Sequence, residues 1–113
     1  MILIVDDNAP IRGLIKQHIQ KINPAQELFE CTDAAEAVEL CRHDPPDWIL
    51  MDIKMPGLDG LAATSEILQI YPDARIIIVT NFDDPELRNA ARANGARGYV
   101  LKERLFELQE LMR

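Results

Sequence analysis

The sequence Trp48-Ile49-Leu50-Met51-Asp52 places a carboxylate directly after four apolar residues, without the alternation of a half-exposed strand. An unbroken apolar run of this kind is typical of a strand that helices cover on both faces of a parallel sheet. Three other runs in the chain also end at a polar residue: residues 2–5 before Asp6 and Asp7, residues 76–79 before Thr80, and residues 99–101 before Lys102. If the four runs are parallel strands, these polar side chains share one edge of the sheet.

Helical patterns separate the strands and complete an alternating β–α order. Capping residues and apolar periodicity predict helices that lie between the strands and after the last one, with a weaker strand at residues 27–31. The expected helices run from the cap Asn8 to Ile22, from the cap Thr32 or Asp33 to Cys41, over residues 59–71, from Asp84 to Gly95, and over residues 104–113. Five βα units predict a flavodoxin-like (βα)5 doubly wound parallel sheet with strand order 2-1-3-4-5.

Length and composition indicate one soluble domain. The chain has 113 residues and a net charge of −7, which argues against non-specific binding to nucleic acid or to anionic membranes. No apolar run is long enough for a signal peptide or a membrane span. Cys31 and Cys41 lack the spacing of a metal or redox motif, so we expect reduced thiols in a cytoplasmic protein.

The strand order brings carboxylates into one crevice, because the first and third strands flank the point where the winding reverses. Two carboxylates 4 Å apart repel by about 4 kcal/mol at an effective dielectric constant of 20. Lys102 alone cannot balance Asp6, Asp7 and Asp52, and oxygen ligands of this kind suit Mg²⁺. Each residue by itself has an ordinary explanation as a strand end or a helix cap, but their common position at strand ends favours a metal site.

Phosphoryl transfer is the chemistry that uses this set of side chains. A carboxylate can attack phosphorus to give an acyl phosphate, while Mg²⁺ and Lys102 neutralise the phosphoryl oxygens. The hydroxyl of Thr80 can bond the transferred group. No histidine, serine or cysteine follows these four strands, and no glycine-rich phosphate loop follows the first. Acyl-transfer triads and nucleotide binding are therefore not indicated.

Four motifs together make the chain resemble the receiver domain of two-component response regulators. They are LIVDDN (residues 3–8), DWILMDIKMPGLDG (47–60), IIIVT (76–80) and GARGYVLKE (95–103). The resemblance covers essentially the whole chain, residues 1–113. It is strongest to receivers that are joined to helix-turn-helix DNA-binding domains, the LuxR type.

The resemblance implies a role for each carboxylate. Asp52 would be the phosphoacceptor. Asp7 and Asp52 would bind Mg²⁺ together with the backbone carbonyl of Lys54, and Asp6 would act largely through a metal-bound water.

The resemblance also implies a switch. Thr80 and Lys102 would hold the phosphoryl oxygens, and Tyr99 would be the aromatic residue that turns inward as the threonine moves. Two positions depart from the common pattern. Glu103 replaces a frequent proline after Lys102, so no cis peptide bond is expected there, and Asn81 replaces a small residue beside the phosphoryl site.

The expected function is a signalling switch that accepts a phosphoryl group from a histidine kinase or phosphotransfer protein. Its only catalysis would be its own phosphorylation and dephosphorylation. The output surface, and a contact face for a homodimer, would comprise the fourth helix, last strand and last helix, roughly residues 84–113. Two alternatives stay open: a degenerate interaction module that works without phosphorylation, and a phosphohydrolase with an aspartyl nucleophile.

Overall fold

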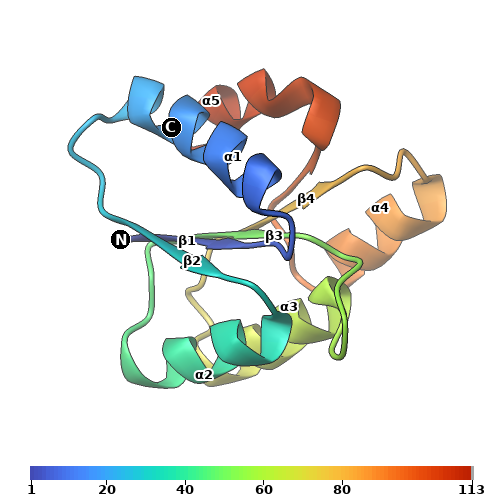
Figure 1. Cartoon of the computed structure of the whole chain (residues 1–113). Coiled ribbons are helices and arrows are strands. Elements are labelled where there is room, and N and C mark those ends of the chain that lie inside the picture. Colours follow the sequence, from blue (N-terminus) through green and yellow to red (C-terminus); the bar gives the residue numbers. More distant parts are fainter. Residues whose placement is uncertain (113) are drawn as a thin grey trace.

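The structure is a computed structural model that describes residues 1–112. Strands alternate with helices along the chain (Figure 1). The elements in chain order are β1 (Ile2–Val5), α1 (Ala9–Ile22), β2 (Leu28–Cys31), α2 (Ala34–His43), β3 (Trp48–Met51), α3 (Gly60–Ile70), β4 (Ile76–Thr80), α4 (Pro85–Ala93), β5 (Gly98–Leu101), the 3-10 helix η1 (Lys102–Glu107) and α5 (Leu108–Leu111). All strand pairs are parallel, and the sheet order β2-β1-β3-β4-β5 confirms the predicted topology. No helix in the described part of the chain is long and apolar enough to cross a membrane.

Side chains of the buried strands point alternately into two cores, one on each face of the sheet. Leu3 and Ile49 belong to the core that packs against α2, α3 and α4. Their neighbours Ile4 and Leu50 belong to the core that packs against α1, η1 and α5. In Figure 1, α1 and α5 lie on one side of the sheet and α2 and α3 on the other. The double cover explains why the strand sequences are apolar without alternation.

Short polar side chains begin four of the helices, as the sequence predicts. Asn8, Asp33, Asp59 and Asp84 each accept hydrogen bonds from backbone N–H groups in the first turn of the helix that follows. These bonds satisfy N–H groups that have no partner within the helix itself. After α4, Gly95 has φ +100°, a left-handed conformation that glycine adopts at low cost.

The predicted last helix is wrong in type and extent. The apolar pattern predicts one amphipathic α-helix over residues 104–113, but the chain forms the 3-10 helix η1 from Lys102 and only a single α-helical turn, α5. Arg104 interrupts η1 with non-helical dihedrals. Leu105 and Leu108 are both buried in the second core, and their spacing of three residues is compatible with a 3-10 helix as well as with an α-helix. The apolar pattern therefore does not distinguish the two helix types, and Arg113 lies outside the described residues.

The cysteines are free and buried, as expected for reduced thiols. Burial raises the pKa of Cys31 to about 12 and that of Cys41 to about 11. Both thiols are therefore protonated at neutral pH and act as small apolar residues.

Gly60 allows the start of α3 to lie directly against the backbone that follows β3. A Cβ atom at this position would clash with the backbone oxygen of Asp52, and the N–H of Gly60 donates to the Ile53 carbonyl at 2.9 Å. Gly13, in α1, has no atom within 4 Å of an added Cβ. Of these two glycines, only Gly60 is required for a close approach, and that approach holds the segment around Asp52.

We predict opposite effects for alanine at these two glycines. Gly60→Ala should destabilise the fold by about 1–3 kcal/mol, the usual cost of overpacking, because the obstructing atom belongs to the backbone. Gly13→Ala should stabilise it by about 0.5–1 kcal/mol, since alanine favours the helix interior. Urea unfolding of both variants checks this pair, and equal effects at the two positions would contradict the proposed close packing.

Candidate metal and phosphoryl-transfer site

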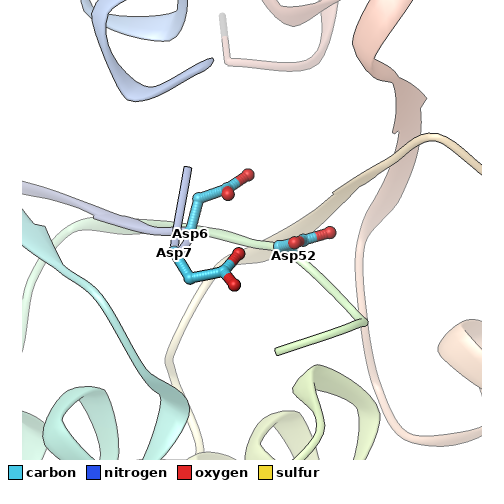
Figure 2. A group of neighbouring side chains, drawn as sticks. All are labelled: Asp6, Asp7 and Asp52. Atoms are coloured by element: carbon cyan, nitrogen blue, oxygen red, sulfur yellow. The ribbon is translucent and has the colours of Figure 1, made fainter. Parts of the chain in front are cut away.

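Three carboxylates meet at the carboxyl ends of β1 and β3 (Figure 2). Asp6 and Asp7 follow β1, Asp52 follows β3, and the two strands are direct neighbours in the sheet. One oxygen from each carboxylate lies within 4.8 Å of the others. Asp6 and Asp52 are buried, whereas Asp7 is exposed. The structure therefore brings together the three carboxylates that the sequence singled out.

Asp6 is held on three sides, yet one of its oxygens lacks a hydrogen bond. Its N–H donates to the Cys31 carbonyl at 3.1 Å, and its Oδ1 accepts from the N–H of Asn8 at 2.8 Å. Its buried Oδ2 has the Lys102 Nζ at 2.8 Å as an ion-pair partner but accepts no hydrogen bond within the described residues. Because a carboxylate oxygen has two lone pairs, Oδ2 can accept a further ligand beside the Lys102 ammonium.

Lys102 reaches the carboxylates from the end of β5, although β4 lies between β5 and β3. Its Nζ is 2.8 Å from Asp6 Oδ2 and 3.4 Å from Asp52 Oδ2, and its side chain is only 8% exposed. One ammonium group faces three carboxylates, so the cluster has a net negative charge when all three are ionised.

Asp52 is a buried acid with a raised pKa. Its Oδ1 accepts from the N–H of Ile53 at 2.9 Å. Burial, and next the negative charge of Asp6, raise the pKa of Asp52 to about 6, although the Lys102 ammonium acts in the opposite direction. The carboxylate is therefore mostly ionised at neutral pH but costs free energy in that form.

The donor set fits a hard divalent cation. Three carboxylates converge, and the buried Asp6 Oδ2 has capacity for another positive partner. Mg²⁺ binds oxygen ligands and needs only a few from the protein, because it retains several waters. Lys54 lies two residues after Asp52, and the role of its carbonyl as a ligand stays a prediction.

Thr80 and Tyr99 both contact the backbone of Phe82, in the loop between β4 and α4. The N–H of Phe82 donates to the Thr80 Oγ1 at 3.3 Å, and the Tyr99 hydroxyl donates to the Phe82 carbonyl at 2.6 Å. Thr80 is fully buried, while Asn81 is exposed. The Arg88 guanidinium lies 4.6 Å from the centre of the Tyr99 ring. One residue thus joins the hydroxyl at the site to the aromatic side chain of β5.

Sequence reasoning missed three residues that shape the site. Gly60 packs against the backbone of Asp52, Phe82 links Thr80 to Tyr99, and Arg12 Nη1 donates to the Asp6 carbonyl at 2.7 Å. Gly60 had a signal, because a glycine directly after a helix cap is compatible with close packing. Phe82 acts through its backbone and Arg12 through a tertiary contact, so the residue types in the sequence do not predict either role.

Comparisons with known proteins agree with this geometry. The sequence profile of the response regulator receiver domain matches residues 2–113. The oxygen regulatory protein NreC of Staphylococcus aureus is 38% identical over 102 residues, which are 89% of this chain and 47% of that protein. The chain therefore spans about half the length of the curated relatives it matches.

Solved structures share the fold across nearly the whole chain. A DNA-binding response regulator of the LuxR family from Staphylococcus aureus has a TM-score of 0.86 at 33% identity, covering 98% of this chain and 93% of that one. The receiver domain of the histidine kinase CKI1 from Arabidopsis thaliana, complexed with Mg²⁺ and BeF₃⁻, has a TM-score of 0.88 at 27% identity, with coverages of 99% and 86%.

The chain belongs to the response regulator receiver domain family. Its similarity to NreC and to the LuxR-family structure confirms the resemblance inferred from the four motifs. The receiver family comprises signalling switches that phosphorylation activates, and membership favours that function over the two alternatives left open by the sequence.

We predict that Asp52→Asn stabilises the metal-free protein at neutral pH. Because the pKa of Asp52 is about 6 when folded and about 3.9 when unfolded, the folded chain binds more protons between these values. Its stability therefore falls as pH rises from about 4 to 6. At about pH 7.5 the variant should exceed wild type by up to about 3 kcal/mol, and the difference should vanish near pH 4.

Urea unfolding in metal-free buffer at both pH values measures this effect. The amide oxygen in the Asp52→Asn variant can still accept the Ile53 N–H bond, so the comparison isolates the charge. Asp73→Asn, at an exposed carboxylate in the turn after α3, is the matched control and should change little. A lower stability of Asp52→Asn than of wild type at about pH 7.5 would show that charge crowding is not the dominant effect.

Proposed function

We propose that this domain accepts a phosphoryl group on Asp52 and thereby switches the surface formed by α4, β5 and α5. The observation that carries the proposal is the buried Asp52 carboxylate with the Lys102 ammonium at 3.4 Å and two more carboxylates within 4.8 Å. Phosphoryl transfer requires a nucleophile, a fixed positive charge and anionic ligands that hold a divalent cation, and these residues supply all three.

The reaction would begin with the ionised form of Asp52. One carboxylate oxygen attacks the phosphorus of a phosphohistidine, the P–N bond breaks, and the imidazole of the donor leaves and takes up a proton. The product on this chain is an acyl phosphate. Lys102, which is held beside Asp52, would pair with a phosphoryl oxygen, and the buried Thr80 hydroxyl would donate to another.

Asp6, Asp7 and Asp52 would hold Mg²⁺, together with the Lys54 carbonyl. When bound, the ion supplies positive charge that offsets the carboxylates and the oxygens of the transferring group. The uncompensated charge of the cluster and the available Asp6 Oδ2 support this assignment. The same residues would support autodephosphorylation by water.

The switch would run through Phe82. If Thr80 moves to bond the phosphoryl group, its hydroxyl no longer accepts the hydrogen bond from the Phe82 N–H. The loop around Phe82, which also accepts a hydrogen bond from the Tyr99 hydroxyl, then loses one of its restraints. Arg88 of α4 stacks on the Tyr99 ring, so a change at Tyr99 reaches α4. A two-state element of this kind is what a covalent modification can bias.

The proposed output surface contains a groove of about 440 Å³ between β5 and the last helical segment. Its lining residues are Tyr99, Phe106, Glu107, Glu110 and Leu111. Phe106 is 58% exposed and Leu111 38% exposed, so apolar area is available to a partner or to a second copy of the domain. A homodimer through this surface is part of the proposal.

The donor, location and extent of the domain complete the proposal. A histidine kinase or a phosphotransfer protein would supply the phosphoryl group. Residues 1–113 would form one receiver unit that itself binds neither nucleic acid nor membrane, in keeping with its net charge of −7. The cytoplasmic location stays a prediction.

We predict stoichiometric phosphorylation of Asp52 by acetyl phosphate in the presence of Mg²⁺. Intact-mass spectrometry should show the gain of one phosphoryl group in wild type and in the control Asp73→Asn. The gain should be absent in Asp52→Asn and in wild type with chelator. An equal gain in Asp52→Asn would refute the assignment, and sustained turnover of a phosphomonoester would favour the phosphohydrolase.

We also predict where beryllofluoride, an acyl-phosphate mimic, changes the structure. Hydrogen exchange with beryllofluoride and Mg²⁺ should change protection mainly in residues 80–112 and in the loop after Asp52. Tyr99→Phe lacks the hydroxyl that bonds the Phe82 carbonyl, so the change in α4 should be smaller in this variant. Changes confined to the first two βα units would show that the switch runs elsewhere.

A further inference from the structure

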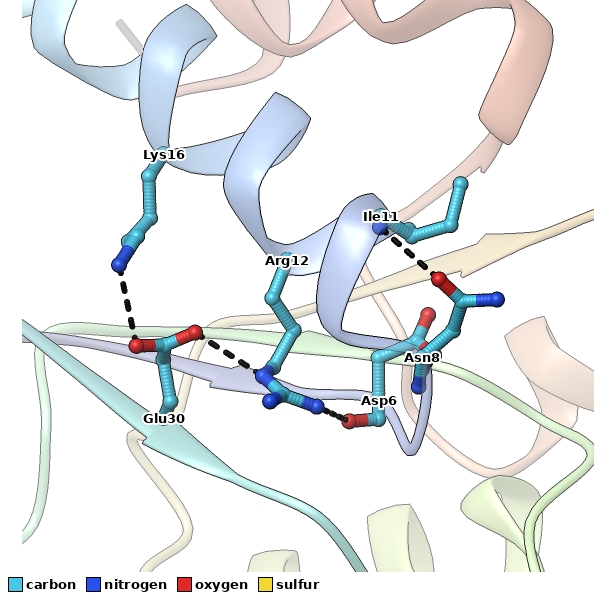
Figure 3. Close-up of polar contacts among 6 residues, drawn as sticks. All are labelled: Asp6, Asn8, Ile11, Arg12, Lys16 and Glu30. Carbon is cyan, nitrogen blue, oxygen red and sulfur yellow. Dashed lines mark hydrogen bonds and ion pairs between the residues drawn. The ribbon is translucent and has the colours of Figure 1, made fainter.

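Arg12 of α1 connects the loop after β1 to the edge strand β2 (Figure 3). Its Nη1 donates to the Asp6 carbonyl at 2.7 Å, and its Nε donates to Glu30 Oε1 at 2.9 Å. Its backbone N–H donates to the Asn8 carbonyl at 3.1 Å. The side chain is only 14% exposed, so the guanidinium is enclosed between α1, the loop and β2.

The carbonyl that Arg12 binds belongs to the peptide between Asp6 and Asp7. The orientation of that peptide plane sets the directions in which both side chains leave the backbone. Asp6 has other restraints, but the exposed Asp7 side chain makes no hydrogen bond or ion pair within residues 1–112. The position of the Asp7 carboxylate therefore depends on the backbone that Arg12 holds.

Glu30 keeps Arg12 in place and is itself held by a second cation. The Nζ of Lys16 lies 3.1 Å from Glu30 Oε2, while Arg12 binds Oε1. Lys16 and, next, Arg12 lower the pKa of Glu30, which keeps the carboxylate ionised. Lys16 thus carries the same charge and binds the same partner as Arg12, but it makes no hydrogen bond or ion pair with Asp6.

We propose that Arg12 is a positioning residue for the carboxylate cluster. Arg12 holds the peptide between Asp6 and Asp7 in the orientation in which both carboxylates can bind a divalent cation. The inference rests on the proposed Mg²⁺ site. A purely electrostatic role would have the opposite sign, because a positive charge near the site repels Mg²⁺. Removal of Arg12 separates the two roles, since loss of positioning weakens metal binding and loss of charge strengthens it.

The test compares the Mg²⁺ affinity of wild type, Arg12→Ala, Arg12→Lys and the matched control Lys16→Ala. Amide chemical shifts followed during a MgCl₂ titration report the dissociation constant without any phosphorylation step. Arg12→Ala should weaken binding about tenfold, the lower end for residues that orient metal ligands. Lys16→Ala should stay within about twofold, because exposed charges are largely screened.

Arg12→Lys keeps the charge but has one ammonium where the guanidinium binds two acceptors. It should bind Mg²⁺ more weakly than wild type, and it decides the question if Arg12→Ala does not fold. Wild-type affinity in Arg12→Lys would overturn the proposal, because metal binding would then not need the guanidinium bridge between the Asp6 carbonyl and Glu30. Equal weakening in Arg12→Ala and Lys16→Ala, or tighter binding in Arg12→Ala, would overturn it as well.

A second readout separates this inference from the metal site itself. The N–H of Asn8 donates to Asp6 Oδ1, so its hydrogen exchange in metal-free protein reports how well the loop is held. Exchange should be faster in Arg12→Ala than in Lys16→Ala, whether or not Mg²⁺ binds. If wild type shows no Mg²⁺ response, the proposed metal site fails, and equal exchange in the two variants would overturn the positioning role.

Discussion

Repulsion between carboxylates at one edge of the sheet is the constraint on which the rest of this structure depends. Parallel pairing of β1 and β3 places Asp6, Asp7 and Asp52 within 4.8 Å of one another. Burial increases the cost, because charges interact more strongly where water is excluded. Lys102 offsets part of this repulsion with a cation at 2.8 Å from Asp6 and 3.4 Å from Asp52, and backbone N–H groups hold both of these buried carboxylates.

The fold supports that cluster from several directions. Two apolar cores cover the sheet, so the strands that end in the acidic residues are fixed on both faces. Gly60 brings α3 against the segment around Asp52, and Arg12 ties the loop after β1 to β2. On the other side of the site, Phe82 bonds both Thr80 and Tyr99. Backbone groups therefore connect the segments around the site to α3, to the edge strand β2 and to Tyr99 of the edge strand β5.

Local signals predicted most of the fold, and tertiary packing decided the exception. Strands and helix starts were correct because apolar runs and capping residues such as Asp59 act over a few residues of chain. The last helix was wrong because Leu105 and Leu108 satisfy the core in a 3-10 geometry that helical periodicity does not distinguish. The strand order followed from the alternation of strands and helices, for which few topologies are available.

The sequence by itself determined which chemical groups stand at the ends of the strands: carboxylates at Asp6, Asp7 and Asp52, a hydroxyl at Thr80 and an ammonium at Lys102. Only the tertiary structure decided how these groups interact. The raised pKa of Asp52, the ion pair between Lys102 and Asp6, and the hold of Arg12 on the Asp6 carbonyl join segments distant in the chain. Residue types and spacing encode composition and periodicity, whereas desolvation and charge interactions depend on distances that exist only after the chain has folded.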